Sequence, residues 1–173
     1  MCTPVLTVDA RPLTILFATE TGTAAMLAEF AAAAGIAAGA SVRLRDMATY
    51  NTARLASEAN ILAIASTHGE GDPPQSALEF FEFLDETCIR LEGVRFAVLA
   101  LGDSGYEDFC AAGRRLDLRL EALGATRIAA RRDIDVGELK DARAWLEHMV
   151  HRFTSEAAVG EPGEWTVGAA RLR

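Results

Sequence analysis

The chain has 173 residues, half of them hydrophobic, which is enough for one domain with a sizeable core. Its net charge of −8 disfavours nucleic acid as a partner and makes a basic partner the expectation. The three cysteines are too widely spaced for a metal motif or a disulfide framework, and no apolar run reaches the roughly 18 residues of a membrane span, so we expect a cytoplasmic protein.

Short apolar runs alternate with longer segments of helical spacing along the chain. The apolar runs predict five strands, at residues 13–18, 41–45, 60–65, 94–101 and 126–131. Helices are expected after four of these strands, over about 23–38, 75–88, 108–123 and 136–153. Residues 46–58 are too few for a full helix with its loops, which predicts irregular turns there. The alternation indicates a parallel, doubly wound α/β sheet with right-handed crossovers.

The domain is expected to span residues 13–153, after an N-terminal extension over residues 1–12. Residues 154–173 contain glycines and a proline without a clear period, which predicts a tail or a linker remnant. Whether Trp165 belongs to such a linker or folds back as an anchor stays open.

Three loops are expected to meet at one edge of this sheet. In an open α/β sheet, ligands bind outside the carboxyl ends of the strands, where the strand order reverses. The loops that follow the first, third and fourth strands occupy residues 18–24, 66–74 and 102–110. The sequence therefore predicts a binding crevice at that edge.

The first loop has the features of a phosphate seat. Thr19, Thr21, Gly22 and Thr23 place amides and hydroxyls at the start of a helix, where the helix dipole favours an anion. The spaced glycines of a dinucleotide site and the lysine of a nucleoside-triphosphate loop are both missing, so a single terminal phosphate fits better. The alternative is that Thr21 or Thr23 only caps the helix.

The other two loops offer flat side chains. Gly69 and Gly71 shape the second loop, and His68 within it can cover one face of a planar ligand. Tyr106 lies on a glycine-flanked turn of the third loop and can cover the opposite face. Together with the phosphate seat, these side chains indicate a planar ring that carries one phosphate.

The three loops are rich in acids and contain no lysine or arginine. A negative field disfavours the addition of further negative charge to a bound redox ring, so the reduced ring is a strong electron donor. The same field attracts a basic partner and speeds its encounter. A solvated acidic rim that only aids solubility is the alternative.

Three segments carry a family resemblance that covers about residues 13–152. They are ILFATETGTAAMLAEFAA, ASTHGEGDPPQSALEFFEFL and FAVLALGDSGYEDFCAAGRRLDLRLEALGA. They resemble the flavodoxin family, and within it the FMN domains of diflavin reductases, above all that of the sulfite reductase flavoprotein. The resemblance implies a flavodoxin-like three-layer sandwich with a five-stranded parallel sheet in the order 2-1-3-4-5.

The resemblance also implies FMN as the cofactor and assigns its site. The phosphate would be held by Thr19, Glu20, Thr21, Gly22, Thr23 and Ala24. One face of the ring would lie along Ser66, Thr67, His68, Gly69, Glu70 and Gly71. The other face would lie along Leu101, Gly102, Asp103, Tyr106, Phe109 and Cys110. Several relatives have tyrosine at the position of His68, and Gly69 matches the residue whose peptide turns toward the ring on one-electron reduction.

The function implied is electron transfer, with no residue acting as a catalytic acid or base and with no metal ligands. Single electrons would pass from an NAD(P)H-dependent flavin reductase or an FAD domain to a basic-faced haem or iron–sulfur protein. Whether the chain is an independent carrier or part of a diflavin reductase stays open. The alternative enzyme is a flavodoxin-like quinone or nitro reductase that uses FMN.

Two other interpretations fit the sequence poorly. A phosphorylation receiver domain needs an aspartate after the third strand and a lysine after the fifth, where this chain has Ser66 and the pair 131–132 of arginines. His148 and His151 lie three residues apart on a predicted helix, but no third ligand is nearby, so they are expected to be surface histidines.

Overall fold

A computed structural model describes residues 11–156 of the chain. The domain boundaries predicted at residues 1–12 and 154–173, and the question about Trp165, fall almost wholly outside the described residues. None of the helices in the described part combines the length and the apolar composition needed to cross a membrane.

The centre of the fold is a parallel sheet in the order β2-β1-β3-β4-β5, which confirms the predicted order. Its strands are β1 (Leu13–Ala18), β2 (Val42–Asp46), β3 (Asn60–Ser66), β4 (Arg95–Gly102), β5 (Thr126–Arg127) and β6 (Arg132–Asp135). The three middle strands, β1, β3 and β4, are almost completely buried, as their continuous apolar runs predict. β2 lies at one edge and is only half-buried.

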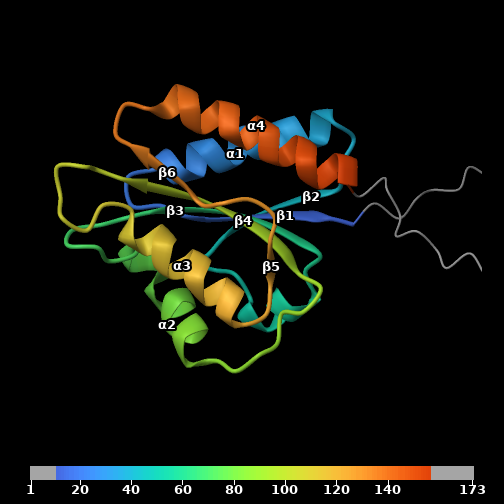
Figure 1. The fold of residues 1–173 in the computed structure, drawn as a ribbon, viewed down its shortest axis with the longest axis horizontal. Coiled ribbons are helices and arrows are strands. Elements are labelled where there is room, and N and C mark those ends of the chain that lie inside the picture. The colour runs from blue at the N-terminus through green and yellow to red at the C-terminus, as the bar shows by residue number, and fades with distance from the viewer. Residues whose placement is uncertain (1–10, 157–173) are drawn as a thin grey trace, which may run out of the picture.

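Helices cover both faces of the sheet and make a three-layer sandwich (Figure 1). They are α1 (Thr23–Ala37), α2 (Leu78–Glu86), α3 (Ala111–Ala122) and α4 (Leu139–Glu156), with short 3₁₀ turns at Thr52–Ser57 and Gln75–Ala77. Figure 1 shows α1 and α4 on one face and α2 and α3 on the other. The turn at Thr52–Ser57 confirms the irregular turns predicted between residues 46 and 58.

Each face of the sheet has its own hydrophobic core, because successive side chains of a strand point to opposite faces. In β3, Ile61 and Ala63 pack toward α2 and α3, whereas Leu62 and Ile64 pack toward α1 and α4. The strands that carry the three loops are therefore packed on both faces.

The fifth position of the sheet differs from the prediction of one strand over residues 126–131. β5 pairs with the start of β4 and β6 with its end, and both pairings are parallel. Residues 128–131 lie between the two ladders, although the Ile128 amide still donates to the Phe96 carbonyl at 2.9 Å. The strand is therefore interrupted, and its second half supplies residues at the rim of the sheet.

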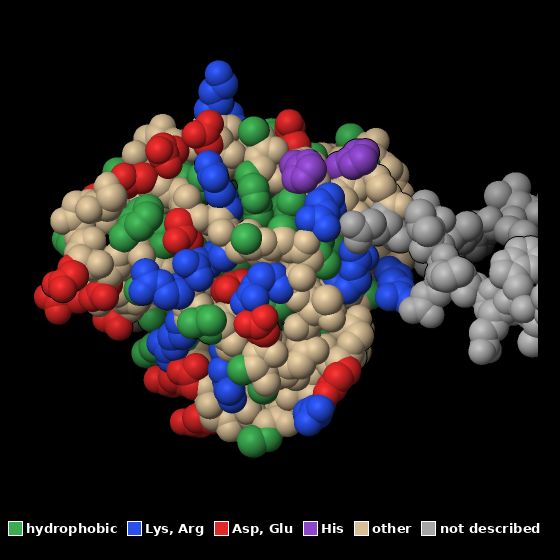
Figure 2. Space-filling view, viewed as in Figure 1, with side chains coloured by type: hydrophobic (Ala, Val, Ile, Leu, Met, Phe, Trp, Pro, Cys, Tyr) green, Lys and Arg blue, Asp and Glu red, His purple; other side chains and the backbone are tan. Residues whose placement is uncertain are grey.

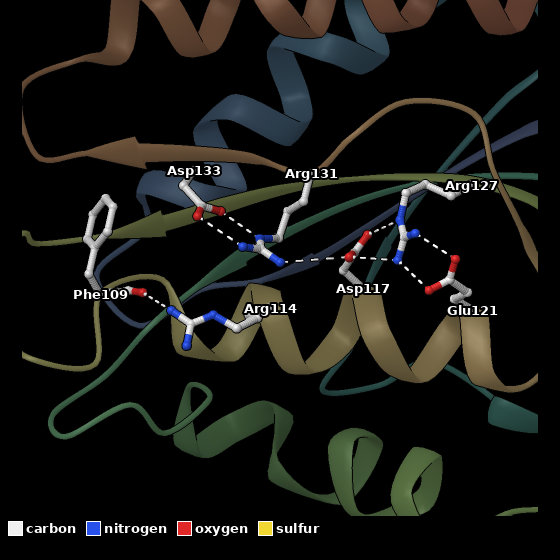
Figure 3. A network of polar contacts seen from close by, with 7 residues as sticks. All are labelled: Phe109, Arg114, Asp117, Glu121, Arg127, Arg131 and Asp133. Carbon is white, nitrogen blue, oxygen red and sulfur yellow. Dashed lines mark hydrogen bonds and ion pairs between the residues drawn. The ribbon is translucent and has the colours of Figure 1, made fainter.

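A buried carboxylate fastens both halves of this strand to α3 (Figure 3). Asp117 is 4% exposed and accepts two hydrogen bonds of 2.9 Å from Arg127. Arg131 lies 3.7 Å from the same carboxylate and donates to Asp133 at 2.6 Å. Hydrogen bonds to Asp117 and Glu121 raise the pKa of Arg127. Hydrogen bonds to Asp133 raise the pKa of Arg131. Residues 128–131 make no strand pairing with β4, and the ion pairs of Arg127 and Arg131 attach this segment to α3 instead.

Helix α3 lies unusually close to β4. A Cβ atom on Gly113 would overlap the Cβ of Ala100, so only glycine permits this approach. The helix begins at Ala111 and not at residue 108 as predicted, because Cys110 has a left-handed φ of 56°. The loop over residues 102–110 is consequently held tightly between the end of β4 and the start of α3.

Candidate functional site

The loops at the carboxyl edge of the sheet enclose a groove made of two adjoining cavities. The narrower cavity has a volume of about 150 Å³ and the wider one about 350 Å³. Both are lined by Thr21, Ser66, Thr67 and Asp103. The narrower cavity continues along Thr23, Leu101, Gly102, Ile134, Asp135, Val136 and Leu139, and the wider one along Glu20, His68, Gly69, Tyr106 and Asp108.

The first turn of α1 opens into the narrower cavity. Gly22 is the N-cap residue, with φ of 94° and no side chain to cap the helix, and the Thr19 hydroxyl accepts its amide hydrogen at 2.9 Å. The first amides of a helix have no acceptor within the helix, and no acid lies in this turn. The alternative that Thr21 or Thr23 caps the helix is therefore wrong, and this turn is suited to bind an anion.

Glu20 ties the first loop to the second. Its amide donates to the Ser66 hydroxyl at 3.2 Å, and that hydroxyl donates to the Ala18 carbonyl at 3.1 Å. One carboxylate oxygen of Glu20 accepts from the Gln75 amide at 3.2 Å, and the other lies 3.8 Å from Nδ1 of His68. These contacts therefore join the loop that precedes α1 to the loop after β3.

The second loop closes on itself and packs against the third. His68 and Asp72 exchange backbone hydrogen bonds of 2.7 and 3.0 Å, which leaves residues 69–71 as a tight turn. Gly69 and Gly71 have φ of 51° and 102°. A Cβ atom on Gly71 would lie 2.8 Å from the Cβ of Asp108, so glycine at this position sets the distance between the two loops.

The third loop presents Tyr106 to the groove. The tyrosine is 62% exposed, and its amide donates to the Asp103 carbonyl at 3.1 Å. His68, whose side chain is 56% exposed, lines the same wider cavity from the second loop. The structure thus brings together the two flat side chains that the sequence predicted for opposite faces of a planar ligand.

A fourth contribution to the rim comes from the end of β6 and the start of α4. Asp135 accepts hydrogen bonds from the amide of Ser104, at 2.9 Å, and from its hydroxyl. These bonds lower the pKa of Asp135. The rule that ligands bind at the carboxyl ends of parallel strands applies to β6 as well, but its charged sequence concealed the strand.

Several predicted site residues support the groove without lining it. They are Thr19, Gly22, Ala24, Glu70, Gly71, Phe109 and Cys110. Ala24 is buried under the first turn of α1, and Glu70 is exposed at the tip of its loop. A Cβ atom on Gly102 would lie 2.6 Å from the Cys110 amide nitrogen, so Cys110 packs directly behind the rim.

Burial and the nearby Asp133 carboxylate raise the pKa of the Cys110 thiol to about 12. We predict that Cys110 resists alkylation in the native protein at neutral pH, because the thiolate is the reactive form and the side chain is inaccessible. The exposed Cys88 serves as the internal control and is expected to react readily. Mass spectrometry of individual peptides after iodoacetamide treatment, with and without urea, measures both. Equal labelling of the two cysteines without urea would contradict the prediction.

Acidic side chains gather around the groove. Figure 2 shows a group of acidic side chains at the end of the molecule where the loops follow the strands. The acids of the three loops are Glu20, Glu70, Asp72, Asp103, Glu107 and Asp108. The same three loops contain no lysine or arginine, so their acids give this edge of the sheet a negative formal charge.

Curated proteins with similar sequences are much longer than this chain. The sulfite reductase (NADPH) flavoprotein alpha-component of Bacillus subtilis is 43% identical over 142 residues, which cover 82% of this chain and 24% of that protein. The protein of the same name from Vibrio parahaemolyticus is 37% identical over 161 residues, covering 91% and 26%. This chain therefore spans about a quarter of the length of these relatives.

Solved structures and a family model agree with the fold. A flavodoxin from Streptococcus pneumoniae superposes with a TM-score of 0.74 at 22% identity, covering 83% of this chain and 98% of the other. Oxidised flavodoxin 1 from Bacillus cereus gives a TM-score of 0.74 at 22% identity, covering 83% and 97%. The flavodoxin family model matches residues 15–149. With its sheet order, its three converging loops and this match, the chain belongs to the flavodoxin family.

Proposed function

We propose that this chain is an FMN-binding module that transfers single electrons. The observation that carries the proposal is the first turn of α1, which lacks both a capping side chain and an acid and opens directly into a groove flanked by His68 and Tyr106. FMN has the one phosphate and the planar ring that these two features fit. When bound, FMN supplies reversible electron uptake and release.

The residues of the groove have separate tasks in this proposal. Thr21, Thr23 and the amides of the first turn of α1 bind the phosphate. His68 and Tyr106 cover the two faces of the ring, and Ser66 and Thr67 line the passage between the two ends. The remaining sequence-predicted residues hold the loops in position, and none is assigned a role as a catalytic acid or base.

The partners follow from charge and from the relatives' names. The acidic mouth favours a basic-faced electron acceptor, for which we propose a haem or iron–sulfur protein. The relatives are named as NADPH flavoproteins, which supports an NAD(P)H-dependent flavin reductase or an FAD domain as the donor. The free thiols of Cys88 and Cys110 support a reducing, cytoplasmic setting.

Binding measurements test the proposal. FMN, riboflavin and FAD are titrated into the purified protein, and the loss of flavin fluorescence reports binding. We expect FMN to bind more tightly than riboflavin by at least about tenfold, since one hydrogen bond to a charged group contributes about 1.5–3 kcal/mol. Absence of FMN binding by correctly folded protein would overturn the proposed function.

A variant of the phosphate seat sharpens the test. Thr21→Ala is expected to weaken FMN binding about tenfold, because one donor to the phosphate is lost, and to leave riboflavin binding almost unchanged. Thr52→Ala, which lies in the turn between β2 and β3 and away from the groove, is the matched control. An equal loss for FMN and riboflavin would place the phosphate elsewhere.

No feature of the groove favours the alternative of a quinone or nitro reductase, because the mouth is acidic. Sustained NADPH oxidation by this chain alone, with FMN bound, is the result that would support that enzyme.

A further inference from the structure

His68 differs in charge type from the other ionisable residues of the groove, which are acids and a tyrosine. Among the described residues that line either cavity, it is the only side chain that can become cationic. The other titratable groups that line the wider cavity are Glu20, Asp103, Tyr106 and Asp108, and Glu70 and Asp72 belong to the same loop as His68. Carboxylic acids titrate near 4 and phenols near 10, whereas imidazole titrates between about pH 5 and 8. Uptake of a proton by His68 would therefore place a positive charge in an otherwise acidic groove.

The backbone and the side chain of His68 are both held at the site. The two hydrogen bonds to Asp72 fix its main chain, and Nδ1 lies 3.8 Å from the Glu20 carboxylate. The second oxygen of that carboxylate is engaged by the Gln75 amide, so the first is oriented toward the imidazole. More than half of the imidazole is exposed, which lets it exchange protons with water.

We propose that His68 couples electron entry into the groove to the uptake of one proton. The inference rests on the proposed function, because it requires a redox group in the wider cavity. One electron arrives from the flavin reductase donor, and one proton from water binds the free imidazole nitrogen, so the charge within the groove stays constant. The new imidazolium is balanced by the electron on one side and by Glu20 on the other.

Linkage fixes the sign of the effect. If an added electron favours the protonated imidazole, then protonation of His68 must favour addition of the electron by the same factor. The midpoint potential should therefore rise as the pH falls through the range in which imidazole titrates. Protons that the flavin ring itself takes up contribute equally in every variant, so the contribution of His68 is the difference between variants.

The test compares the pH dependence of the midpoint potential in FMN-loaded proteins. The midpoint potential of the wild-type protein should rise as the pH falls from about 8 to about 5.5. This rise should exceed the rise in His68→Gln by about 59 mV, which for one electron is about a tenfold change in the electron-transfer equilibrium constant. Glu20→Gln should move the wild-type rise to lower pH, because the imidazolium loses its anionic partner. His148→Gln, on the opposite side of the sheet from α2 and α3, is the matched control and should retain the wild-type profile.

Two further readouts make the outcome decisive. Nitrogen NMR of the His68 ring should show a larger protonated fraction in the reduced than in the oxidised FMN complex at the same pH. Circular dichroism verifies that each variant is folded. Parallel pH profiles in wild type and His68→Gln, with FMN bound in both, would overturn this inference alone. Failure of the wild-type protein to bind FMN would overturn the proposed function and this inference with it.

Discussion

Replacing Asp117 with asparagine is expected to lower the free energy of unfolding by about 3 kcal/mol, near the lower end of the range for breaking a buried ion pair. The substitution conserves volume, so no cavity contributes. It removes the charge shared by Arg127 and Arg131, both of which are only about one-fifth exposed. Urea denaturation followed by circular dichroism measures the change.

Glu121 provides the matched control, because it contacts the same Arg127 but is 53% exposed. Exposed ion pairs contribute about 0–1 kcal/mol, so Glu121→Gln should change stability by less than about 1 kcal/mol. A similar loss in the two variants would show that the number of charges near Arg127 matters and that the burial of Asp117 does not.

Replacing Gly71 with alanine is expected to cost about 3 kcal/mol of stability and to weaken FMN binding more than about tenfold. A φ of 102° is strained for alanine, and the new Cβ would lie 2.8 Å from that of Asp108. Relief of this contact requires the second and third loops to separate, which widens the cavity between His68 and Tyr106. Urea denaturation and FMN titration measure the two effects.

Gly69 tests whether the effect arises from packing or from backbone conformation alone. It also has a positive φ, of 51°, but a Cβ atom at this position would have no neighbouring atom within 4 Å. Gly69→Ala should therefore cost only about 1–2 kcal/mol, the strain of a left-handed residue. Equal losses of stability at the two glycines would remove the close approach to Asp108 as the cause.

The sequence was sufficient to predict the strands and helix ends that are determined by the residues within or next to them. Apolar runs indicated the positions of β1, β3 and β4 within about one residue, and Gly39 ends the first helix as expected, with φ of 81°. Sheet order followed from the family resemblance. The convergence of the loops after β1, β3 and β4 could also be predicted, because parallel strands that alternate with helices end at one edge.

The interruption of the fifth strand could not be predicted, because it depends on contacts between distant parts of the chain. Arg127 and Arg131 read as ordinary strand-end residues until Asp117, on the preceding helix, is seen to bind both. The segment RDID contains three charged residues, so hydrophobicity alone does not mark it as a strand. The hydrogen bonds that join Asp135 to Ser104 likewise link two distant loops and leave no local signal in the sequence.

The direction of α4 limits how a covalently attached electron donor can reach the flavin groove. The helix begins at Leu139 beside the narrower cavity and runs for 18 residues toward the other end of the molecule (Figure 1). At 1.5 Å per residue, the chain leaves this helix about 27 Å from where it began. A tether returning over that distance needs at least about eight extended residues. A reductase fused after this helix would therefore need a linker of at least that length to reach the groove. A separate acceptor protein could then bind at the same face when the reductase has moved away.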